Sequence, residues 1–182
     1  VGGELVQAIG GGICYASTAL FRAVYQAGLQ IVEHHPHSRP LERHGNGLGF
    51  DSAVYSPGLD LRWRNDTPHP IEVATSVDAS SGKVTIAVWG VSDGRTATVR
   101  GPSIKNRRSV PDTWQFDAGM AEGASRKTVD KLEGMDVVFS RVVRAADGAV
   151  LHDDGFRARY TPRGATYRFG NGVTPPEGAV VE

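Results

Sequence analysis

The only cysteine, Cys14, lies two residues after a run of glycines at positions 10–12, where a helix-like pattern begins. The N-terminus of a helix carries partial positive charge, and its unpaired N–H groups favour an anion. Because a thiolate rather than a thiol attacks a carbonyl carbon, this position suits a nucleophile. The amides of Gly11, Gly12 and Cys14 are the predicted oxyanion donors, since no side chain covers the two glycines.

Two histidines some twenty residues downstream, His35 and His37, are candidate bases for this thiol. Alternation along a predicted strand at 29–38 places both on one face, together with Glu33. Asp51 is the best candidate to orient the base, because a carboxylate on one ring nitrogen fixes the tautomer and supports the imidazolium. Glu33 is the reserve candidate for that role.

Each of these features could also have a structural or metal-binding role. A lone cysteine is most often a small buried apolar residue, and a glycine run can serve only a tight turn. His35, His37 and His44 with Asp51 could instead bind zinc, although an H-x-H pair alone is a weak indication of a metal site. We therefore predict a cysteine site without metal, and a buried structural cysteine and a zinc site stay open as alternatives.

Hydrophobic periodicity predicts one helix from Cys14 to Ala27, which Gly28 ends. Because this helix is apolar on two faces, we expect it to be buried. Alternating patterns and turn residues predict strands elsewhere, at 29–38, 51–55, 59–64, 70–76 and 83–89 and in several runs after residue 95, with a linker at 101–120.

These elements predict an α+β fold, in which one buried helix bears the cysteine at its N-terminus and packs on an antiparallel sheet. A mostly β, elongated second unit follows. The expected division is a catalytic domain at 1–98, a β-rich accessory module at 99–172 and a flexible tail at 173–182.

Composition excludes several classes of protein. The 182 residues include 20 Lys plus Arg and 20 Asp plus Glu, whereas a nucleic-acid-binding protein usually has a basic surplus. No apolar run approaches the roughly 20 residues that span a bilayer. The sequence begins at Val1 rather than Met, so we expect a piece of a longer protein whose missing upstream segment anchors it to a membrane. One cysteine excludes an internal disulfide and leaves the compartment open.

A set of positions in the first half of the sequence matches the pattern of a known family: residues 10–14, Ser17, Thr18, 27–29, 31–33, His35, His37, Ser38, Asp51, Asp60, Leu61, 65–67, Pro70 and Ile71. Through these positions, residues 1–90 resemble the VanW domain. Two positions depart from the family pattern: Tyr15 stands where Gln is most common, and Phe50 where Arg or Met is common. Residues from about 101 to 170 more loosely resemble the small glycine-rich extracellular β module often joined to VanW domains.

The resemblance implies an extracellular protein of the bacterial cell envelope, in a family associated with glycopeptide-resistance gene clusters. Some members are understood as L,D-transpeptidases that use the family's cysteine, which implies this role for Cys14 on peptidoglycan stem peptides. It favours His35 as the base, because the match is closest around it, and it calls for no cofactor.

Arg43 and Arg64 are candidate partners for a stem-peptide carboxylate, and Tyr15 is a further candidate substrate contact. Two alternative functions stay open. One is a cell-wall peptidase of the NlpC type, which also places a cysteine at a helix start. The other is a wall-binding module without catalysis, in which Cys14 belongs to the core.

Overall fold

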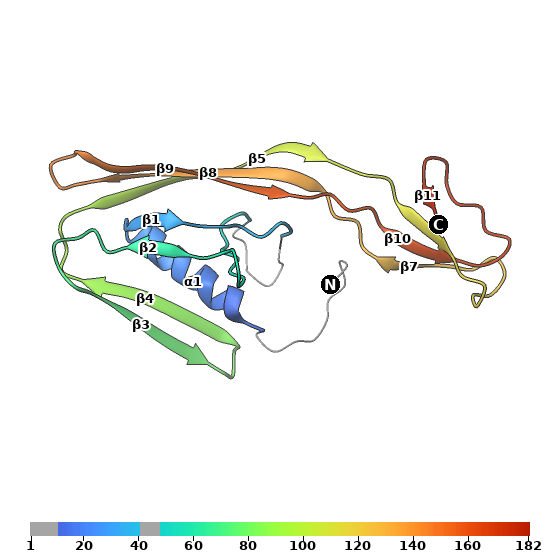
Figure 1. Ribbon diagram of the computed structural model, residues 1–182, viewed down its shortest axis with the longest axis horizontal. Coiled ribbons are helices and arrows are strands. Elements are labelled where there is room, and N and C mark those ends of the chain that lie inside the picture. The colour runs from blue at the N-terminus through green and yellow to red at the C-terminus, as the bar shows by residue number, and fades with distance from the viewer. Residues whose placement is uncertain (1–10, 41–47) are drawn as a thin grey trace. The chain divides into compact units, whose positions relative to one another are not determined.

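The computed structural model describes residues 11–40 and 48–182. The chain divides into two compact units: unit 1 comprises residues 1–102 and 138–157, and unit 2 comprises residues 103–137 and 158–182. The elements shown in Figure 1 are, in chain order, α1 (Ile13–Gln26), β1 (Gln30–Glu33), β2 (Arg62–Arg64), β3 (Ile71–Asp78), β4 (Lys83–Gly90), β5 (Thr96–Arg108), β6 (Thr113–Phe116), β7 (Ser125–Val129), β8 (Gly134–Arg144), β9 (Val150–Tyr160), β10 (Thr166–Phe169) and β11 (Val180–Val181).

The fold is mostly β, and the α+β class predicted from the sequence is wrong. Strands and isolated β-bridges account for 47% of the described residues and helix for 8%, so one helix packed on one antiparallel sheet does not describe the molecule. The described strands form separate sheets instead, in the orders β1–β2, β3–β4, β5–β8–β9 and β11–β6–β10–β7. The helix has the most regular hydrophobic periodicity in the sequence, and the predicted fold class therefore gave it too much weight.

Glycine and proline inside a long strand are the reason that the prediction of a linker was wrong. The segment predicted as a linker at 101–120 carries most of β5 and all of β6. Gly101 has a φ of 98°, and a Cβ there would lie 2.9 Å from the carbonyl oxygen of Val138. It therefore marks a close approach of two chain segments rather than a break in the strand.

Two other predicted strands are shorter than expected. The strand predicted at 29–38 ends at Glu33, before Pro36, which cannot donate a main-chain hydrogen bond. The strands predicted at 51–55 and 59–64 reduce to an isolated bridge between Tyr55 and Leu59 and to β2. The strands predicted at 70–76 and 83–89 are close to the observed β3 and β4, which pair as a hairpin from Ile71↔Gly90 to Asp78↔Lys83.

The predicted helix is present as α1, and its end follows the expected glycine rule. Gly28 has a φ of 76°, and its N–H donates to the carbonyl of Tyr25. Phe21, Val24 and Tyr25 are fully buried, but Ile13 in the first turn is 57% exposed. The helix is therefore buried along its later turns and open at the end that carries Cys14. No described helix is long and apolar enough to cross a membrane.

The core of unit 1 joins α1 to strands far away in the sequence. Phe21 and Tyr25 pack with Phe139 of β8, and Phe50 and Phe156 lie against this cluster. Their rings make tilted, edge-on and stacked contacts at centroid distances between 5.0 and 6.1 Å, which are favourable geometries. Figure 1 shows the β3–β4 hairpin running along α1, which also contacts β1.

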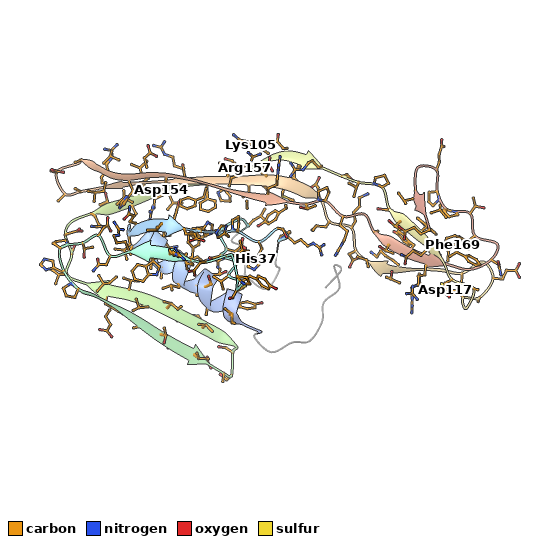
Figure 2. All side chains as sticks on the ribbon, in the orientation of Figure 1. His37, Lys105, Asp117, Asp154, Arg157 and Phe169 are labelled. Carbon is orange, nitrogen blue, oxygen red and sulfur yellow. The ribbon has the colours of Figure 1, made fainter. Side chains whose placement is uncertain are left out.

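A buried arginine caps the C-terminal end of α1. Arg141 of β8 is 0% exposed and donates to the carbonyls of Tyr25 at 2.7 Å and Leu29 at 3.0 Å. Its Nε donates to Asp154 of β9 at 3.0 Å (Asp154 is labelled in Figure 2). A cation here complements the negative end of the helix dipole and satisfies carbonyls that the helix leaves unpaired.

Replacing Arg141 with Met should destabilise the protein by about 3–5 kcal/mol, because it leaves Asp154 and two carbonyls without their buried partner. Arg144 lies on the same strand but is exposed, so Arg144→Met is the matched control and should cost less than about 0.5 kcal/mol. Urea unfolding of the three proteins measures both values. Equal losses would show that the arginine does not hold the helix end.

Candidate active site

The main chain of residues 50–53 lies against α1 through a pair of buried hydroxyl groups. The Thr18 hydroxyl accepts the N–H of Ser52 at 3.0 Å and donates to the Ser52 carbonyl at 3.3 Å. The Ser17 hydroxyl donates to the Ser52 hydroxyl at 3.0 Å. Ser52 is fully buried, so these bonds replace water for polar groups that would otherwise be unsatisfied. They fix where this segment lies along the helix that carries Cys14.

The neighbouring residues of the same segment are also attached through their main chain. Arg22 of α1 donates from Nε to the Phe50 carbonyl at 2.8 Å. The Ala53 N–H donates to the His35 carbonyl at 2.7 Å. The segment is thus attached to α1 on one side and to the chain following β1 on the other, which places Asp51 between them.

Asp51 is directed at His37. The carboxylate accepts the main-chain N–H of His37 at 3.0 Å and makes a short contact with the Nδ1 atom of the same residue. Asp51 is only 5% exposed, so both interactions are shielded from water. Since Nδ1 faces the carboxylate, the imidazole presents Nε2 on its opposite side. Figure 2 labels His37 in the segment after β1.

Cys14 completes this arrangement. Its side chain is close enough to the His37 ring to help raise the pKa of that imidazole, and its sulfur lies 3.6 Å from the Val54 carbonyl oxygen, within reach of a thiol hydrogen bond. The cysteine is free and partly buried. Asp51, His37 and Cys14 therefore form the linear order of orienter, base and nucleophile that acyl transfer requires.

The environment of His37 favours its charged form. The hydrogen bond with Asp51 is the main cause that raises the pKa of His37 above its ordinary value, and the contact with Cys14 adds to it, whereas partial burial opposes it. An imidazolium at this position is a suitable partner for a thiolate.

The first turn of α1 supplies N–H groups near the sulfur. Gly12 is the N-terminal cap with a φ of 93°, and its carbonyl accepts the N–H groups of Tyr15 at 3.0 Å and Ala16 at 3.2 Å. The N–H groups of Ile13 and Cys14 have no acceptor within the helix. No acidic residue lies in this turn. The glycine at position 12 meets a conformational need, since a Cβ there or at Gly11 would contact nothing within 4 Å.

The structure brings His37, and not His35, to Asp51 and Cys14. The Nε2 atom of His35 donates to Glu33 at 2.9 Å, and Glu33 also lies 3.3 Å from Arg62. The reserve orienter therefore pairs with the other histidine.

The predicted substrate contacts fall in different places. Tyr15 follows Cys14 on the first turn and is 37% exposed. Arg64 pairs with Gln30, just past the opposite end of α1, and a 14-residue helix is about 20 Å long. Arg64 is therefore not brought to the sulfur. Arg43 lies outside the described residues.

The zinc alternative receives no support from the described part of the chain. Residues 11–40 and 48–182 contain no group of three or more His, Cys, Asp or Glu side chains arranged to hold a metal ion. His44, which the alternative requires, lies outside these ranges.

Three contributions to the site were missed by sequence reasoning. Thr18 entered only through the family resemblance, and His34 and the carbonyl of Val54 were assigned no role. The only available indication was the spacing of Thr18 four residues after Cys14, which places both on one face of a helix. Hydrogen bonds to main-chain atoms leave no residue-type pattern at the accepting position.

Comparison with known proteins agrees with the sequence-based resemblance. The family model described as "VanW like protein" matches residues 1–89. The uncharacterized protein YoaR of Bacillus subtilis (strain 168) is 44% identical over 71 residues, which is 39% of this chain and 23% of that protein. The chain thus covers under a quarter of this relative's length.

A solved structure titled "IgA1 Protease G5 domain structure" is 14% identical with a TM-score of 0.29, and the match covers 42% of this chain and 90% of that chain. A similarity this low carries no argument about the fold or the function.

The pKa values of His37 and His34, the two imidazoles that contact Asp51, should be shifted in opposite directions from the ordinary value of 6.5. We expect an NMR titration to place the midpoint of His37 above this value and that of His34 below it, because a carboxylate supports the first and burial penalises the charge of the second. Asp51→Asn should lower the midpoint of His37. An unchanged midpoint in that variant would contradict the assigned Asp51–His37 pair.

Proposed function

We propose that the chain is a cysteine acyltransferase that cross-links peptidoglycan stem peptides, as an L,D-transpeptidase does. Support comes from the match of residues 1–89 to the model of the VanW family, which is associated with the cell wall. The observation that carries this proposal is the contact of His37 with both Asp51 and Cys14 at the start of α1.

In the first step the sulfur of Cys14 attacks the carbonyl carbon of the diamino-acid residue in the stem peptide. His37 takes the thiol proton, and Asp51 stabilises the resulting imidazolium. The tetrahedral intermediate collapses, the peptide bond to the terminal D-alanine breaks, and His37 gives its proton to the departing amine. The products of this step are a thioester on Cys14 and free D-alanine.

In the second step an amine of a neighbouring stem peptide attacks the thioester. His37 accepts a proton from the amine and returns it to the sulfur as the carbon–sulfur bond breaks. A new peptide bond cross-links the two stems, and Cys14 is a thiol again. Water in place of the amine would give a carboxypeptidase.

The oxyanion of each intermediate needs donors near the sulfur. Support comes from the first turn of α1, where the N–H of Cys14 has no acceptor within the helix, and from the partial positive charge of that helix end. The sequence also assigns donors at Gly11 and Gly12. A single donor of this kind contributes about 3–4 kcal/mol in enzymes where it has been removed.

Tyr15 and Arg43 are the proposed substrate contacts. Tyr15 is exposed beside Cys14, and Arg43 keeps its proposed role toward a stem carboxylate. We place the protein outside the cytoplasmic membrane, where peptidoglycan lies.

Mass spectrometry of muropeptides incubated with the purified chain tests this function. The wild type should release D-alanine and form a cross-linked dimer, and Cys14→Ala should do neither. His37→Gln should lower the rate about 10²- to 10⁴-fold, as expected for loss of a general base. His35→Gln is the matched control in the same segment and should retain most activity, because His35 pairs with Glu33.

Other outcomes would identify the alternatives. Hydrolysis of a stem peptide without any dimer would favour the NlpC-type peptidase. Activity that survives in Cys14→Ala, or an equal loss in the His35 and His37 variants, would contradict the proposed mechanism. Binding of the wild type and Cys14→Ala to cell walls without a product in either case would favour the non-catalytic module.

A further inference from the structure

His34 lies directly after β1, and aromatic rings fix its orientation. Its imidazole stacks on Phe21 of α1 with a centroid distance of 3.9 Å and an interplanar angle of 15°. Phe156 of β9 approaches the same imidazole edge-on at 5.5 Å. A ring held between two others has little freedom to rotate, so its two nitrogens point in defined directions.

The nitrogen Nε2 of His34 lies 2.7 Å from the main-chain carbonyl oxygen of Asp51. A carbonyl can only accept, so Nε2 must carry the proton. Burial is the main cause that lowers the pKa of His34, and the nearby His35 lowers it further. The hydrogen bond to Asp51 and the charge of Asp51 act in the opposite direction and raise it. The ring is therefore neutral at neutral pH, with its proton on Nε2 and none on Nδ1.

The short segment 34–37 consequently binds Asp51 at two places, the side-chain carboxylate and the main-chain carbonyl. His37 holds the carboxylate through its main-chain N–H and Nδ1, and His34 holds the carbonyl of the same residue. Without the bond from His34, the peptide group between Asp51 and Ser52 would lose the attachment on its carbonyl side, although Thr18 would still hold Ser52.

We propose that His34 is a positioning residue, which as the neutral Nε2–H tautomer fixes the main chain of Asp51 so that the carboxylate stays on His37. This inference rests on the proposed Cys14–His37–Asp51 mechanism. His34 touches neither the sulfur nor the substrate in this role, and acts only through Asp51.

Two substitutions separate the hydrogen bond from the ring contacts. His34→Phe keeps an aromatic ring to stack on Phe21 but has no donor for the Asp51 carbonyl. His34→Gln keeps an N–H donor at a similar distance from the main chain but removes the aromatic stack. A purely structural role predicts that the loss of the stack does the greater damage to the site.

The rate of Cys14 alkylation by iodoacetamide at neutral pH is the first measurement, and it requires no turnover. We expect His34→Phe to slow it about fivefold, which is the effect of one neutral hydrogen bond, and to lower the NMR titration midpoint of His37. His34→Gln should alkylate within about twofold of the wild type, even where its melting temperature falls. Equal rates for the wild type and His34→Phe would overturn the proposal.

His37→Gln distinguishes this proposal from the proposed function. If His37→Gln slows the alkylation of Cys14 and His34→Phe does not, only the role of His34 is overturned. If His37→Gln is alkylated as fast as the wild type, the proposed mechanism is overturned as well.

The tautomer gives a test in the unmodified chain, which applies even where a variant does not fold. Nitrogen NMR shifts of the wild type at neutral pH should show His34 neutral with its proton on Nε2. A proton on Nδ1 would overturn the proposal, because Nε2 could then not donate to Asp51.

Discussion

The main chain of residues 50–53 is hydrogen-bonded to α1 on one side and to the segment after β1 on the other, and the candidate site depends on this double attachment. Cys14, His37 and Asp51 come from three separate parts of the chain and share no regular sheet or helix. Thr18 and Arg22 hold the segment from the helix, and His34 and the carbonyl of His35 hold it from the opposite side. Main-chain hydrogen bonds, rather than side-chain packing alone, set the distances between the chemical groups.

Burial and charge act differently on two histidines that face the same aspartate. Asp51 presents its carboxylate to His37, which favours the imidazolium, and its neutral carbonyl to His34, which is compatible with an uncharged ring. The two histidines lie close together in the sequence, yet one is suited to proton transfer and the other to support. The aromatic rings of Phe21 and Phe156 pack on His34, and partial burial there lowers the pKa of this imidazole. The apolar core therefore also shapes the electrostatics of the site.

Part of this arrangement could be predicted from the sequence. Periodicity and glycine placement indicated the helix and the position of Cys14 at its start, and residue chemistry selected Asp51. Spacing could not separate His35 from His37, since an extended strand would place both on one face, whereas the actual strand ends at Glu33. The family resemblance favoured His35, but it is His37 that contacts Asp51. The fold class was wrong because interactions over long sequence separations decide it: Arg141, which caps α1, lies 116 residues beyond Tyr25.

The most direct test of this mechanism is the intact mass of the protein shortly after it is mixed with stem peptides. We expect a covalent adduct whose mass equals the stem peptide without its terminal D-alanine, attached to Cys14 and absent from Cys14→Ser. Adding an acceptor amine should remove the adduct and yield the cross-linked product. An adduct on another residue, or product formation by Cys14→Ser, would contradict the claim that this sulfur carries the acyl group.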